Sequence, residues 1–255
     1  MSVIDEVFAS PAAQWINRKI VGLPLHASVR ASNAVRALIW ANRIADTPDV
    51  GDVSMQIPAT YCALHATEEA AAAFIRSAQV LGYEGADRLS IKTHKSKAIT
   101  SLIAQQMSNI LNAEVSPAIS VHEDSDTLVA RWKDSDEFSY GLATLSGSFF
   151  QNGDGSAKQG FTEEILQRIG DPAVLADLVH RGHQARIRIF YADDDGLPTG
   201  FDEPDVALRR EAGITLGLIW ATIDLNNYPD EKIPFYQQAI ATANQIAQEY
   251  GRPRR

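Results

Sequence analysis

The chain has 255 residues, of which 45% are hydrophobic and 22% are charged, and its formal net charge is −9. This length and composition suit a globular protein with one large domain or two small ones. The acidic balance excludes a generic duplex binder, which needs a basic footprint, so any contact with nucleic acid must come from a local patch.

The features that bear on location point to the cytoplasm. Residues 1–10 carry acids where a signal peptide carries lysines, and no run reaches the roughly 18 apolar residues that a membrane span needs. Cys62 is the one cysteine, so an intrachain disulfide is excluded, which fits a reducing compartment. We therefore expect a soluble cytoplasmic protein that makes no membrane contact.

Apolar residues recur at helical spacing over three segments in the first half of the chain, residues 27–44, 58–81 and 90–111. Gly82 follows the second segment as a natural helix stop. The predicted apolar side of the first helix consists of Val29, Val35, Leu38, Ile39 and Trp40. In the second half, helices are predicted over residues 162–169, from residue 172, over 204–225 and over 234–250. The stretch 184–192 fits either a strand or a continuation of the helix that begins at residue 172.

Between these helical regions the pattern changes to the alternation of strands. The predicted strands centre on residues 119–121, 128–132 and 138–142 and form an antiparallel meander. We therefore predict a mainly α fold, a helical bundle with a small antiparallel β insertion, α+β overall. The predicted arrangement is a single domain over residues 1–255, in which residues 27–113 and 161–250 form the bundle and residues 114–160 form the β-meander insertion and a loop.

Two adjacent acids interrupt the small, apolar run "YCALHATEEAAAAFI". At helical spacing, Glu68 falls on the bulky apolar stripe and Glu69 on the next one. A buried carboxylate needs a partner, because burial without one costs several kcal/mol or drives the group to take up a proton. The next helix opens with "RLSIKTHKSKA", where His94 and Lys97 share a face. Antiparallel packing of the two helices would bring that face to the glutamates.

A glutamate pair in a small-residue helix, followed by His-x-x-Lys at the start of the next helix, resembles the AbiV-type abortive-infection proteins of the HEPN superfamily. The stretch "RIRIFYADDDGLPTGFDEPDV" (186–206) is similar to that family's Tyr-x-Asp, its glycine-containing turn and its proline-led helix. The resemblance covers roughly residues 27–111 and 186–225. It implies a HEPN-like bundle, a phage-defence or toxin-like role, and a homodimer.

The resemblance also implies a chemistry, because many HEPN domains are metal-independent ribonucleases that use an Arg and a His. Arg88 and His94 are the expected catalytic pair. The histidine would move a proton from a ribose 2′-hydroxyl, and the arginine would hold the phosphate of the RNA. The expected supporting residues are Glu68, Glu69, Lys95 and Lys97, and the expected substrate-binding residues are Arg186, Arg188 and Tyr191. Neither a metal nor a cofactor is expected.

An alternative interpretation of these charged residues involves no catalysis. Glu68 or Glu69 could pair with His94, Lys97 or an arginine only to fix the packing of two helices. The protein would then be a non-catalytic helical module that binds a protein partner or dimerises. Adjacent helical positions point about 100° apart, so the two glutamates cannot easily share one metal ion or one proton.

Overall fold

The structure is a computed structural model that describes residues 3–49, 54–114, 118–122, 124–134, 137–190 and 203–251. Its helices are α1 (Val3–Ala9), α2 (Pro11–Ile20), α3 (Leu25–Ala45), α4 (Gln56–Val80), η1 (Ala86–Arg88, 3₁₀), α5 (His94–Glu114), α6 (Thr162–Ile169), α7 (Pro172–Phe190), α8 (Pro204–Asn227) and α9 (Pro234–Glu249). Its strands are β1 (Ala118–His122), β2 (Thr127–Asp134) and β3 (Glu137–Leu142), in the order β1-β2-β3. The predicted mainly α fold with a small antiparallel sheet is confirmed.

The helix boundaries lie close to the predicted ones, with informative differences. Helix α5 begins at His94 rather than at residue 90, and α7 continues to Phe190, which makes the ambiguous stretch helical as far as it is described. Helices α1 and α2 were not predicted. Helix α2 begins where the Ser10 hydroxyl accepts a hydrogen bond from the Ala13 N–H, with Pro11 at its first position.

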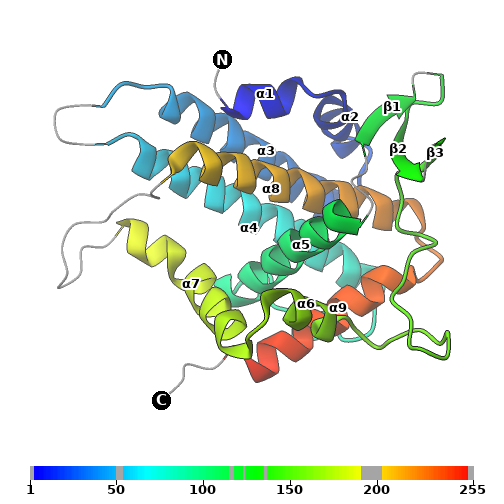
Figure 1. The fold of residues 1–255 in the computed structure, drawn as a ribbon. Helices are drawn as coiled ribbons and strands as arrows, with labels where there is room; N and C mark the ends of the chain where they lie inside the picture. The colour runs from blue at the N-terminus through cyan, green and yellow to red at the C-terminus, as the bar shows by residue number, and fades with distance from the viewer. Residues whose placement is uncertain are drawn as a thin grey trace.

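Helix α4 occupies the centre of the bundle. It packs against α3, α5, α7 and α8, and Figure 1 shows α3, α4 and α8 side by side with α5 crossing them. A helix that is covered on several sides must carry small side chains if its neighbours are to approach closely. The fully buried alanines of α4 are Ala59, Ala63, Ala66, Ala70, Ala71, Ala72, Ala73 and Ala78.

The predicted apolar side of α3 is partly wrong. Val35 and Leu38 are buried, but Val29, Ile39 and Trp40 are exposed, Val29 by 59% and Trp40 by 47%. The side that faces the core is built mainly of Ala27, Ala31, Ala34, Ala37 and Ala41. The close contact between α3 and α4 explains the difference, because bulky residues on the shared face would push the two helices apart.

The three-stranded sheet is attached to the bundle through α2. The Trp15 Nε1–H donates to the Asp126 carbonyl at 2.7 Å, in the turn between β1 and β2. Asp126 has a φ of 45°, a left-handed conformation that aspartate tolerates better than most residues. Its carboxylate pairs with Lys19 at 2.8 Å and with Arg18 at 3.0 Å, and the hydrogen bonds from these two cations lower the pKa of the Asp126 carboxyl.

The segment between β3 and α6 is fastened to α8 and α9. Gln238 donates to the carbonyls of Phe150 and Lys158, both at 2.8 Å, and accepts from the Phe150 N–H at 2.9 Å. The buried Asp224 carboxylate accepts from the Leu145 N–H at 3.0 Å and from the Tyr236 hydroxyl at 2.7 Å. These bonds bring the segment into one core with the helices, although a single domain over all 255 residues stays a prediction.

Tyr236→Phe should lower the free energy of unfolding by about 1–3 kcal/mol near pH 7, because the buried Asp224 carboxylate loses a donor. Burial, and then the charge of Asp224, raise the pKa of Tyr236 well above its ordinary value. The unfolded chain therefore ionises first, and this part of the stability is complete below about pH 10 and is lost as the pH rises further. Urea titrations across the alkaline range should show a shallower loss for the variant; an equally steep loss would contradict the assignment.

Gly217→Ala should raise the free energy of unfolding by about 0.5–1 kcal/mol, because a Cβ at this mid-helix position of α8 meets nothing within 4 Å. Gly160→Ala is the contrasting change. Its Cβ would lie 2.8 Å from the Thr242 hydroxyl oxygen, which accepts from the Phe161 N–H. That variant should lose about 1–3 kcal/mol. Chemical denaturation measures both, and two shifts of the same sign would refute the packing described.

Candidate functional site

The carboxylate of Glu68 joins α4 to the first turn of α5. His94 Nδ1 lies 2.8 Å from Glu68 Oε1 and 3.0 Å from Oε2, and Lys97 Nζ donates to Oε2 at 3.0 Å. The two α5 residues are three apart and reach the same carboxylate from one face of their helix. The prediction that this face would meet Glu68 is confirmed.

Burial differs sharply among the three partners. The side chains of Glu68 and Lys97 are 11% and 8% exposed, whereas the His94 side chain is 46% exposed. Lys97 neutralises the carboxylate inside the bundle, and His94 meets the same carboxylate at the surface. A carboxylate that accepts from Nδ1–H fixes the orientation and tautomer of an imidazole and leaves Nε2 as its basic nitrogen. The arrangement can therefore both stabilise the helix pair and present an oriented imidazole to solvent.

Arg88 lies in η1, six residues before His94, and is exposed. The backbone around it is held in place by Gln79 of α4, whose side-chain amide donates to the carbonyls of Ala86 at 3.2 Å and Leu89 at 2.8 Å. Neither Arg88 nor His94 is sealed inside the protein. Their pairing as a catalytic couple stays a prediction.

Glu69 points away from this cluster, as expected for its position on the helix. Its Oε2 accepts from the Asn33 side-chain amide at 3.2 Å and lies 3.8 Å from an Arg30 nitrogen, so it faces α3. Lys95 also lies elsewhere: it packs against Gly251, just beyond α9, where a Cβ would overlap the lysine side chain. The cation near the C-terminus of α9 complements the helix dipole.

The side chains of the remaining predicted residues lie outside the part of the chain that the structure describes. Arg186 and Arg188 are on the last turns of α7, in a part of the helix whose side chains are not described. Tyr191 and most of the second resembling stretch lie outside the described residues. Their substrate-binding role stays a prediction.

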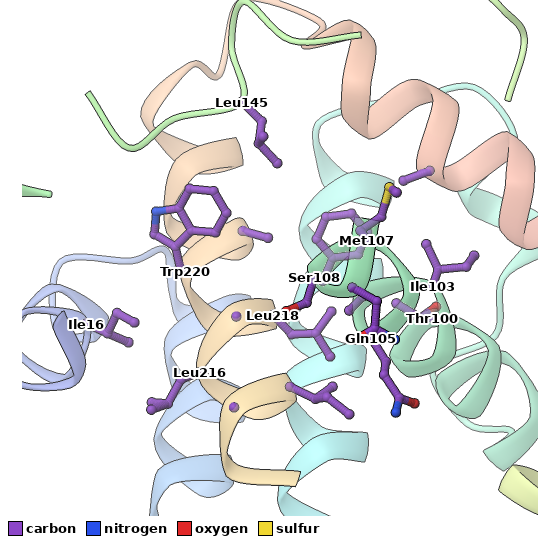
Figure 2. Close-up of a pocket in the computed structure, with 18 of the residues that line it drawn as sticks. Ile16, Thr100, Ile103, Gln105, Met107, Ser108, Leu145, Leu216, Leu218 and Trp220 are labelled. Carbon is purple, nitrogen blue, oxygen red and sulfur yellow. The ribbon is translucent and has the colours of Figure 1, made fainter. Parts of the chain in front are cut away.

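A second feature is an apolar cavity of about 720 Å³ between α2, α5, α8 and α9. In Figure 2, Ile16, Trp220 and Leu145 approach it from three different elements, and Met107 reaches it from α5. Gly213 and Gly217 of α8 form part of its wall, where a Cβ would meet open space. The cavity suits an apolar ligand or side chain, and among the described residues its lining contains no His, Asp, Glu, Lys or Cys.

Sequence reasoning missed two buried acids and a basic groove. Glu211 of α8 accepts from the Thr67 hydroxyl at 2.8 Å across the α4–α8 contact, and Asp224 anchors the segment after β3. In the sequence, Glu211 and Asp224 each interrupt an apolar helical run, as Glu68 does. That pattern could have indicated that both acids are buried. A groove between α3 and α4, lined by Arg30, Arg36 and Arg76, had a signal too, because the sequence of α3 contains three arginines and neither Asp nor Glu.

Within the described part of the chain, no group of three or more His, Cys, Asp or Glu side chains is placed to hold a metal ion. No described helix is long and apolar enough to cross a membrane. Comparisons with protein-family models, with curated proteins and with solved structures gave no match.

Glu68→Gln should lower the free energy of unfolding by about 3 kcal/mol, because it leaves the buried Lys97 ammonium without its counter-ion. Glu69→Gln is the matched control. Its arginine is farther away, and its Asn33 bond survives in the amide, so the cost should stay below about 1 kcal/mol. Urea denaturation at pH 7 measures both. Equal losses would show that the Glu68 pair has no special structural role.

Proposed function

We propose that the protein is a metal-independent endoribonuclease of the HEPN type, acting in the cytoplasm in a phage-defence or toxin-like role. The contact of His94 Nδ1 with the Glu68 carboxylate carries the proposal, because it holds an imidazole in a fixed orientation at the protein surface. The motifs shared with AbiV-type proteins supply the substrate class and the defence role. A protein of net charge −9 would meet RNA through local cations.

The proposed reaction is a transesterification that needs no added reactant. His94 Nε2 accepts the proton of a ribose 2′-hydroxyl, and O2′ forms a bond to the adjacent phosphorus. The bond from phosphorus to O5′ breaks, and the leaving oxygen takes a proton from water while the imidazolium returns its own to solvent. The products are a 2′,3′-cyclic phosphate and a 5′-hydroxyl.

The neighbouring residues have separate parts in this proposal. Glu68 orients the imidazole and stabilises its protonated form, as a carboxylate behind a catalytic histidine does. Lys97 is a positioning residue, because it is buried and holds Glu68. Arg88, which is exposed on η1, would bind the phosphate and offset the charge that develops on it.

The second candidate is a non-catalytic helical module that binds a protein partner or dimerises. The burial of both Glu68 and Lys97 favours it, since a pair of this kind fixes helix packing whether or not chemistry takes place. Under this candidate His94 completes the pair and the protein carries no nuclease activity. Self-association, which the resemblance also implies for the enzyme, is tested separately by sedimentation velocity.

The purified chain should cleave single-stranded RNA in the presence of EDTA and leave 2′,3′-cyclic phosphate ends. His94→Ala should lower the rate at least about 100-fold, because it removes the proton acceptor. Gel electrophoresis of end-labelled RNA gives the rate, and treatment with a 2′,3′-cyclic phosphodiesterase identifies the ends.

His180→Ala is the matched control, because His180 is exposed on α7 and lies outside the proposed site. It should cleave at the wild-type rate. The nuclease proposal fails if the wild type does not cleave, or if His94→Ala and His180→Ala cleave equally well. Circular dichroism of each variant confirms that a lost activity is not lost folding.

A further inference from the structure

A basic groove of about 800 Å³ runs between α3 and α4, on the side of α4 that carries Glu69. Its charged or polar lining includes Arg30, Arg36 and Asn33 from α3 and Arg76 and Glu69 from α4. Among the described residues, Glu69 is the only acid in this lining. The groove therefore holds three guanidinium groups against one carboxylate, in a chain whose net charge is −9.

The arginines are only partly occupied by their neighbours. Arg30 lies 3.8 Å from the Glu69 carboxylate, which is a loose ion pair. Arg36 donates to the Asn33 side-chain oxygen at 2.5 Å, and Arg76 donates to the Gln79 side-chain oxygen at 3.3 Å. Neutral amides orient a guanidinium without cancelling its charge, so both keep their attraction for an anion.

Two further observations favour an anion in the groove. Helix α3 begins at Leu25, in the groove wall, with no side-chain cap, and its N-terminal dipole end is positive. His26 also lines the groove, and its Nε2 atom is buried without a hydrogen-bond partner among the described residues. Burial, and then the charge of Arg76, lower the pKa of His26, which favours the neutral form of its imidazole.

Next to the groove is an exposed aromatic side chain. Trp40 lies one turn of α3 beyond Arg36, is 47% exposed, and has the Arg36 guanidinium 5.2 Å from its ring centroid. A cationic groove beside an aromatic face is the combination that binds single strands of nucleic acid, since the cations follow the phosphates and the ring stacks on a base.

We propose that the α3–α4 groove binds the backbone of single-stranded RNA, with Arg30, Arg36 and Arg76 on phosphates and Trp40 stacked on a base. This inference rests on the proposed ribonuclease function for the identity of the ligand. The site itself is separate from the Glu68 cluster, because adjacent positions on α4 point about 100° apart.

The charges of the α3–α4 groove also indicate which kind of ligand it would bind. A second copy that paired α3 against α3 would bring arginines together with no acid on either helix to offset them. An acidic protein segment would meet the cations and could cover the exposed Leu25 and Val29. The cation–π contact of Arg36 with Trp40 and the arginine-lined groove beside the helix N-terminus favour a phosphate chain instead.

The probe is a fluorescein-labelled 2′-O-methyl RNA of about 12 nucleotides, a length within the range of single-strand binding sites. It has no 2′-hydroxyl, so it cannot be cleaved by the proposed reaction. Fluorescence anisotropy gives its Kd at several salt concentrations. The triple variant R30Q/R36Q/R76Q should bind at least about tenfold more weakly and flatten the slope of log K against log salt by about 2, close to 0.7 for each lost phosphate contact.

Trp40→Ala should weaken binding by about tenfold without changing the salt slope, because stacking releases no counter-ions. The charge-matched control R168Q/R181Q/R209Q, with exposed arginines from other helices, should retain the wild-type Kd and slope. The groove assignment is overturned if the wild type does not bind, if the control weakens as much as the groove variant, or if polyglutamate binds the groove and RNA does not. Because the probe resists cleavage, loss of the nuclease proposal alone would leave this result standing.

Discussion

The central constraint on this fold is the crowding around α4. Helices α3, α5, α7 and α8 pack against it, and they can do so because its buried positions are mostly alanine. Alanine also has the highest helix propensity, so the same choice strengthens the helix that the others pack on. The cost is that α4 has little large apolar surface of its own, and its larger neighbours on α5, α8 and α9 supply most of the bulk of the core.

A carboxylate in such a helix is tolerated only with its partners in place, and this links the core to the surface. Glu68 needs Lys97 inside the bundle, and that bond sets the position of the first turn of α5. Once that turn is set, His94 reaches the same carboxylate at the rim. The structural and the catalytic interpretations of the cluster therefore use the same bonds. What separates them is whether the exposed imidazole transfers a proton.

Sequence patterns predicted helices α3 to α9, the meander and the face shared by His94 and Lys97, because each depends on short-range spacing. Gly82 ends α4 with a φ of 69°, as its type and position suggested. The sequence pattern failed where tertiary packing determines which side of a helix is buried. Val29 and Trp40 of α3 were predicted to be core residues but are exposed, because alanines fill the face of α3 that packs against α4. Arg88 and His94 can be matched to a motif by spacing, but whether they act together depends on how η1 sits against α5, which no local pattern encodes.

The two adjacent glutamates of α4, Glu68 and Glu69, have very different electrostatic surroundings. Glu68 faces α5 and is matched by one buried lysine, so its surroundings are close to neutral. Glu69 faces α3 and an open groove, in which Arg30 and Arg36 of α3 and Arg76 of α4 outnumber it. Stability alone does not require that surplus, because like charges repel and an acid on α3 would relieve them. A local arrangement that runs against stability is typical of a functional site, and the phosphates of the proposed RNA ligand would supply the missing negative charge.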